Sequence, residues 1–317
     1  IRMVRKLKIR NLRSLCPAIS LRGACSSFAL VALAISGCNR DNLRGAIPDA
    51  AAAREMRLTL AKSETVQAAD SGSADAQQRT GWGTLRGRIR VVGSTPQNRV
   101  LNINKDQAVC QPGGTPVRGE SVEVDSATGG LANVLLYALD LDGENVHEGA
   151  QGNTDSILYD QKVCRYLSHV LPMQTTQSLE VKNSDIVSHN TQIQAKRGRS
   201  INENIPPGSS IQYAPGKEEK EPISVSCAVH PWMKAYLLPR DNGYFATTQQ
   251  DGTFEIANLP AGIDLSVQAW QEKLGKNFEG IKVNGEPATW KRGRIALKLE
   301  PDETAMLDIE IPASVLQ

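Results

Sequence analysis

The chain has 317 residues and a formal net charge of +2, which is enough length for about two domains. Seven of its 36 basic residues lie within the first 37 positions, where no acidic residue occurs, so 29 basic residues face 34 acidic ones in the remainder. Nucleic-acid binding depends on clustered positive charge and is therefore not expected.

The N-terminal segment, residues 1–37, is predicted to be a secretory signal. Its basic start is followed by the apolar run FALVALAI, which is too short for a membrane-spanning helix of about 20 residues. The following stretch ISGC resembles the lipobox of bacterial lipoproteins, which implies a lipid on Cys38 and a membrane-anchored protein of the periplasm or cell surface. The alternative is an ordinary signal cleaved nearby, with Cys38 incidental.

Two segments of different composition follow. Residues 38–80 are rich in Ala, Asp, Ser and Gln and poor in apolar runs, so a flexible linker is expected. From Gly81 onward, short runs alternate apolar and polar residues and are separated by Gly, Pro, Asn and Asp, which is typical of β-sandwiches. Examples are TLRGRIRVVG, ANVLLYALD, QSLEVKNSD, PISVSC, GTFEIANLPAG, LSVQAW and MLDIEIP. The predicted fold class is all-β.

The number of cysteines limits the roles that each of them can have. With Cys16 and Cys25 in the signal segment and Cys38 carrying lipid, three of the six remain. An odd number outside the cytoplasm implies that one has a special role. If Cys110 pairs with Cys164, the free thiol is Cys227, which a bound metal would protect.

The stretch SCAVHPWM, Ser226 to Met233, places a thiol, an imidazole and a thioether at intervals of three. Cys227 and His230 could face one ion from a tight turn, with Met233 as a weak axial ligand. One more imidazole, from His189, would complete the His2Cys plane with a long axial Met that is typical of copper. Each residue also has a plainer interpretation: a buried apolar cysteine, a histidine at a strand end, and a methionine that fills the core.

This pattern resembles the cupredoxins, and its His-Pro-aromatic-Met loop resembles that of the amicyanins. The resemblance implies a Greek-key sandwich with copper bound by His189, Cys227, His230 and, axially, Met233. It also implies that Asn190 braces the ligand loop. The other neighbours expected around the metal are Ser226, Pro231 and Trp232.

A second resemblance covers the C-terminal part. The stretch GYFATTQQDGTFEIANLPAGIDLSVQAW resembles carboxypeptidase-regulatory, transthyretin-like sandwiches. Together with the copper turn, it makes the chain from Trp82 onward similar to exported bacterial proteins often labelled methylamine-utilisation-like. We expect a cupredoxin-like domain over residues 81–240 and a transthyretin-like domain over residues 241–317. In the alternative, TLRGRIRVVG belongs to the second domain and the cupredoxin is inserted.

The predicted function is one-electron transfer with an extracytoplasmic redox protein, entering at an exposed edge of His230 and the apolar surface near Pro231 and Trp232. No enzymatic activity is expected, because His147 in a solvated loop and His169 in a structural position cannot build the His-rich centre of a copper oxidase. The alternatives are a non-redox copper carrier or sensor, and an adhesion protein with a structural metal.

Overall fold

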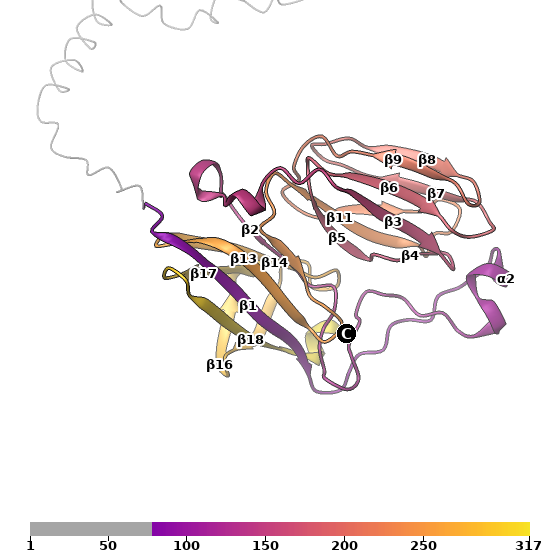
Figure 1. Ribbon diagram of the computed structural model, residues 1–317. Helices are drawn as coiled ribbons and strands as arrows, with labels where there is room; N and C mark the ends of the chain where they lie inside the picture. Colours follow the sequence, from indigo (N-terminus) through magenta and orange to yellow (C-terminus); the bar gives the residue numbers. More distant parts are fainter. Residues whose placement is uncertain (1–77) are drawn as a thin grey trace, which may run out of the picture. The chain divides into compact units, whose positions relative to one another are not determined.

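β-Strands are the main regular secondary structure of the protein in a computed structural model that describes residues 78–317 (Figure 1). The predicted signal segment, the lipidation site Cys38 and the predicted linker as far as residue 77 lie outside the described residues. Within residues 78–317, no helix is both long and apolar enough to cross a bilayer. The strands form four sheets, which confirms the predicted all-β class.

One sandwich has its strands on both sides of the other in the sequence, and we name it the outer sandwich. It consists of two sheets with strand orders β13-β1-β18-β15-β16 and β12-β2-β14-β17. Its strands are β1 (Gly81–Val92), β2 (Leu135–Ala138), β12 (Phe245–Thr247), β13 (Thr253–Ala261), β14 (Asp264–Trp270), β15 (Phe278–Val283), β16 (Glu286–Trp290), β17 (Arg294–Lys298) and β18 (Thr304–Pro312). Burial alternates along β1, where Leu85, Ile89 and Val91 are buried, because successive side chains of a strand face opposite sides of the sheet. These residues join one large apolar core.

The inserted sandwich also has two sheets, with strand orders β5-β11-β10-β7-β8 and β4-β3-β6-β9. Its strands are β3 (Ser156–Lys162), β4 (Arg165–Tyr166), β5 (Val170–Gln174), β6 (Ser178–Asn183), β7 (His189–Ile193), β8 (Ile201–Ile205), β9 (Ser210–Tyr213), β10 (Ile223–Ser226) and β11 (Lys234–Arg240). It has a core of its own, which includes Met173, Val181 and Leu237. Figure 1 shows this sandwich beside the outer one.

Strand pairing corrects the predicted start of the first domain at residue 81, whereas residue 240 does separate β11 of the inserted sandwich from β12 of the outer one. β1 runs parallel to β18, with Thr84 opposite Thr304, and antiparallel to β13, so it belongs to the outer sandwich. β2 likewise pairs with β12 and β14. The first domain therefore does not begin at residue 81, and the alternative with an inserted sandwich matches the structure. The reason is physical: alternation along a strand indicates one buried face but carries no information about which distant strand it pairs with.

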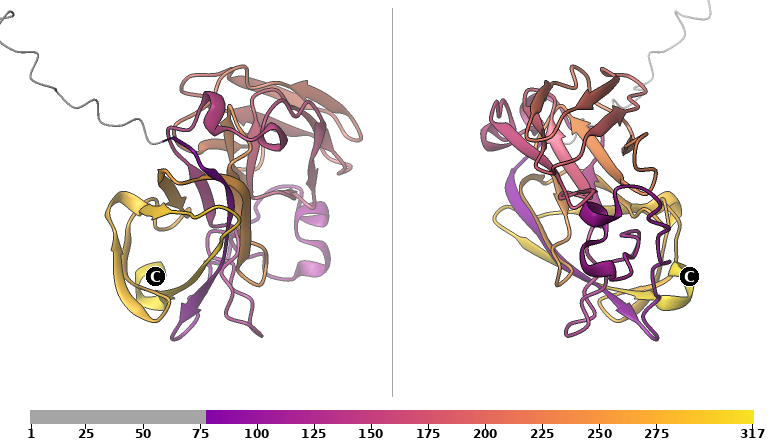
Figure 2. Two further views of the ribbon diagram at one scale, coloured as in Figure 1. Left: turned by 60° about the vertical axis from the view of Figure 1, so that its left-hand side comes forward. Right: turned by 90° about the vertical axis from the view of Figure 1, so that its right-hand side faces the viewer.

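The two sandwiches share a small apolar contact, formed by Leu135 and Tyr137 of β2, Val170 of β5 and Leu238 of β11. The long connection between β1 and β2 leaves the outer sandwich and carries α2 (Gln107–Cys110) to the inserted one, as the views of Figure 2 show. The remaining short helices are η2 (Pro112–Gly114), η3 (Gly143–Asn145), η4 (Glu148–Ala150), η5 (Lys291–Gly293) and η6 (Ala313–Leu316).

Candidate metal centre

The turn between β10 and β11 gathers three of the predicted ligands. Ser226 and Lys234 are paired across the two strands, so the seven residues between them form one short loop. The Met233 amide donates to the His230 carbonyl at 2.9 Å, and the Cys227 amide donates to the Met233 carbonyl at 3.3 Å. These bonds hold the cysteine, the histidine and the methionine at the same end of the inserted sandwich, where all three side chains are buried.

The fourth predicted ligand, His189, begins β7, the strand that pairs with β10 in the same sheet. Its Nδ1 lies 2.9 Å from Nδ1 of His230, and that His230 atom lies 3.9 Å from the Cys227 sulfur. All three donor groups lie within 4.8 Å of one another, and the two histidine side chains are fully buried. Two imidazole nitrogens and one thiol that converge in this way fit a soft transition metal such as copper. Met233 is buried in the same apolar cluster, and its role as a ligand stays a prediction.

Burial and neighbouring groups shift the pKa values of three residues in the metal-free site. Burial opposes protonation of His189, but its contacts with Asp185 and Cys227 outweigh that effect and raise its pKa to about 9. Burial likewise disfavours a thiolate at Cys227, yet the neighbouring His189 and several backbone amides lower the pKa of the thiol. Burial lowers the pKa of His230. The raised pKa of His189 and the lowered pKa of Cys227 both favour the charged forms of these side chains, and a metal that binds there competes with their protons.

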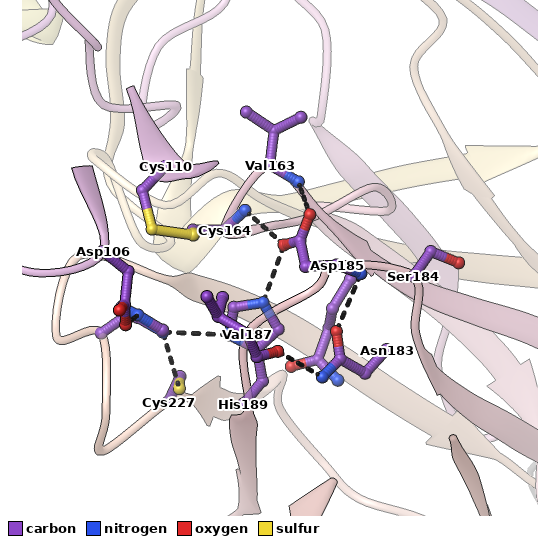
Figure 3. Close-up of polar contacts among 12 residues, drawn as sticks. Asp106, Cys110, Val163, Cys164, Asn183, Ser184, Asp185, Val187, His189 and Cys227 are labelled. Carbon is purple, nitrogen blue, oxygen red and sulfur yellow. Dashed lines mark hydrogen bonds and ion pairs between the residues drawn. A yellow bond between two sulfur atoms is a disulfide. The ribbon is translucent and has the colours of Figure 1, made fainter. Parts of the chain in front are cut away.

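The two candidate-ligand histidines, His189 and His230, each contact a carboxylate through the ring nitrogen that faces away from the other ligands. Nε2 of His189 lies 2.8 Å from Oδ2 of Asp185, and Nε2 of His230 lies 2.8 Å from Oδ2 of Asp106. Asp185 also accepts hydrogen bonds from the backbone amides of Val163 and Cys164, as Figure 3 shows. Such contacts fix the orientation of each ring and leave its Nδ1 atom directed at the other candidate ligands.

Sequence reasoning missed both carboxylates. Asp185 lies four residues before His189 in the stretch SDIVSH, so its proximity to a predicted ligand was a usable signal. Asp106 lies 124 residues before His230, in the connection that carries α2, and no local pattern marks it.

Asn190 occupies the predicted bracing position. Its backbone amide donates to the Cys227 sulfur at 3.3 Å, and its Oδ1 accepts from the Ala228 amide at 3.2 Å. Ser226, in contrast, donates its hydroxyl to Gln192 on the adjacent strand at 3.5 Å, so its side chain is engaged away from the ligands.

The expected exposed edge of His230 is not present. The side chain is fully buried, because Asp106 covers its outer nitrogen and the Trp232 ring lies 5.2 Å from its ring, measured between centroids. Pro231 is exposed and Trp232 is half-buried. Both line a cleft of about 340 Å³ that His169 and Glu272 also border. Trp232, rather than His230, is thus the aromatic group beside the ligands that reaches the surface.

The other predicted cysteines and histidines have structural surroundings. Cys110 and Cys164 form a disulfide, and Cys227 is the free cysteine among the described residues. His169 is buried against Glu272, which fits the structural role expected of it. His147, expected in a solvated loop, is half-buried and packs its ring edge-on against Trp82, with centroids 4.9 Å apart.

No family model matches the chain, and no curated protein matches it. Solved structures that are similar to it include a copper-containing nitrite reductase from Thermus scotoductus SA-01, with 16% identity and a TM-score of 0.25; the similarity covers 32% of this chain and 27% of the reductase. A mutant of amicyanin in the Cu(I) form has 13% identity and a TM-score of 0.24, over 33% of this chain and 98% of amicyanin. A purple cupredoxin from Nitrosopumilus maritimus has 19% identity and a TM-score of 0.23, over 27% of this chain and 98% of that protein. The likeness of the outer sandwich to transthyretin-like domains stays a prediction.

Proposed function

We propose that the chain binds one copper ion through His189, Cys227 and His230, with Met233 as a weak axial ligand, and transfers single electrons. The observation that carries this proposal is the convergence of two Nδ1 atoms and one thiol in a buried site whose histidines are already fixed from behind. Copper bound there supplies a one-electron couple and an intense thiolate absorption band. Rings that are held in place before the metal binds need little rearrangement when the charge of the site changes.

The route for electrons differs from the one expected from the sequence. Because His230 is buried, we propose that electrons pass through Trp232, whose ring lies against His230 and lines the surface cleft. The partner is a redox protein outside the cytoplasm, and the chain is anchored there by a lipid on Cys38. We propose that it is a carrier of electrons and not an enzyme.

The test is the visible spectrum of the full chain with one equivalent of Cu(II). We expect an intense thiolate-to-copper band, which Cys227→Ser and His189→Ala abolish while the far-ultraviolet circular dichroism stays unchanged. His147→Ala is the matched control and keeps the band, because His147 packs against Trp82 away from the ligands. A colourless wild type, or colour retained by Cys227→Ser, would contradict the proposal.

Burial of His230 also favours a second candidate, a copper carrier without redox function, since electron transfer benefits from a ligand close to the surface. A carrier binds Cu(I) preferentially and gives it up quickly to a chelator. Slow release of copper together with reversible reduction at an electrode supports electron transfer. Rapid release of Cu(I), without a stable Cu(II) form, supports the carrier.

A further inference from the structure

One disulfide lies next to both carboxylates that hold the histidines. Cys164 donates its backbone amide to Oδ2 of Asp185 at 2.8 Å, and that same oxygen contacts His189 (Figure 3). Cys110 ends α2, and its amide donates to the carbonyl of Asp106 at 2.9 Å. The two sulfur atoms and a nitrogen of His230 lie within 4.8 Å of one another. The bond between Cys110 and Cys164 therefore joins the supports of the two imidazoles.

Residues 102–116, which we name the cap segment, contain Cys110 and are tied by this bond to Cys164. At its base, the Leu101 amide donates to the Val117 carbonyl at 2.8 Å. Within the described chain, the hydrogen bonds of the cap segment stay inside it, with one exception, the contact of Asp106 with His230. Apart from the apolar packing of Ile103, Val109 and Cys110, the disulfide and this one polar contact attach the cap segment to the inserted sandwich.

The other end of the bond lies in an unfavourable backbone conformation. Val163 and Cys164 have φ angles of 53° and 52°, in the left-handed region that costs residues with a β-carbon about 1 kcal/mol or more. Both amides donate to the Asp185 carboxylate, at 2.7 and 2.8 Å. The turn is thus maintained by the carboxylate and by the covalent bond to the cap segment.

We propose that the Cys110–Cys164 disulfide locks the metal site closed, with Asp106 and Asp185 as the positioning residues through which it acts. Reduction by a dithiol breaks the S–S bond: two electrons and two protons pass to the half-cystines, which become thiols, and the dithiol becomes a disulfide. The cap segment then leaves His230, and the ligands become accessible from that side. The consequence for copper depends on the proposed function, whereas the lock itself does not.

The lock is tested in metal-free full-length protein by the rate at which iodoacetamide alkylates Cys227, scored by mass spectrometry on the peptide that contains it. With the disulfide intact, we expect a slow reaction, because the thiol is buried. We expect an increase of at least about tenfold in Cys110→Ser/Cys164→Ser, and a smaller one in Asp106→Asn with the disulfide intact, because local opening governs access to a buried group. Asp155→Asn, at an exposed aspartate of the chain, is the matched control and leaves the rate unchanged.

Rates within about twofold of the wild type in both variants overturn the lock, since the opening step would then not depend on the cap segment. Asp106→Asn keeps the test decisive if the double variant is unfolded, because it retains every cysteine. After copper loading, transfer of Cu(I) to a chelator should be fastest in Cys110→Ser/Cys164→Ser, slower in Asp106→Asn and slowest in the wild type. Failure to bind copper overturns the proposed function and leaves the alkylation result standing, whereas equal alkylation rates overturn the lock even in a protein that binds copper.

Discussion

At the scale of single residues, Asn190 joins the ligand turn to the strands behind it. Its Oδ1 accepts from the Ala228 amide, and its Nδ2 donates to Asn202 at 2.8 Å and to the Glu203 carbonyl at 3.2 Å. One side chain thereby connects β7, β8 and the turn that carries Cys227. The contact with the Cys227 sulfur comes from the backbone of Asn190 and does not depend on the side chain.

The variant Asn190→Ala should therefore show whether this side chain stabilises the ligand turn without being needed for copper binding. Loss of the side chain removes three partly buried hydrogen bonds, so we expect the free energy of unfolding to fall by about 1 to 3 kcal/mol. The backbone bond to sulfur remains, and the visible copper band should persist. Urea unfolding and the visible spectrum measure the two effects. Asn104→Ala, at an exposed asparagine, should change neither, and complete loss of the band in Asn190→Ala would show that the side chain is essential for ligation.

The candidate ligands could be predicted because three of them lie within seven consecutive residues, where spacing alone brings the side chains to one turn. The surroundings of His230 could not be predicted in this way. Its cover is Asp106, a residue from a distant segment whose path depends on a disulfide and on the pairing of β1. The prediction of an exposed His230 edge was wrong for this reason.

At the scale of elements, the pairing of β1 with two neighbouring strands leaves no room for a side chain at Gly87. A β-carbon on Gly87 would lie 2.3 Å from the Leu307 carbonyl oxygen and 2.6 Å from the Phe254 ring, because β1 is enclosed by β18 and β13. No side chain fits there without movement of the backbone. The repeated alternation of TLRGRIRVVG predicted the strand itself, but its partners lie far away in the sequence and were not predictable from alternation.

Gly87→Ala should destabilise the outer sandwich by about 1 to 3 kcal/mol, the usual cost of overpacking a core. Gly119→Ala is a suitable comparison, since the nearest atom to its added carbon lies 3.8 Å away, in ordinary contact. Thermal unfolding followed by circular dichroism measures both variants. Equal stability of the two would contradict the close packing of β1 against β18.

At the scale of the whole described molecule, the two sandwiches meet through a polar contact as well as an apolar one. His169 precedes β5 of the inserted sandwich, and Glu272 follows β14 of the outer one; Nε2 and Oε2 are 2.6 Å apart. The Tyr236 ring packs edge-on against His169, with centroids 5.9 Å apart. Because this pair spans the two sandwiches, its protonation state affects how firmly they are attached.

The pair should make stability depend on pH. Burial opposes protonation of His169, but the hydrogen bond with Glu272 and the charges of Glu120 and Glu123 outweigh it and raise its pKa above the ordinary 6.5. A group whose pKa is raised by folding stabilises the folded state fully below its unfolded pKa, and that contribution disappears as the pH rises through the folded pKa. We therefore expect Glu272→Gln to lower the free energy of unfolding by about 1.5 to 3 kcal/mol at pH 5.5, and by much less at pH 9.

Urea unfolding of metal-free protein at these two pH values measures the difference, with Glu279→Gln, at an exposed glutamate of the outer sandwich, as the control. The control should show no such pH dependence, since its charge lies away from His169. A Glu272→Gln effect of equal size at both pH values would mean that the contact stabilises through packing and a neutral hydrogen bond. An effect that disappears at high pH would mean that the charged pair itself attaches the inserted sandwich beside the cleft that Trp232 lines.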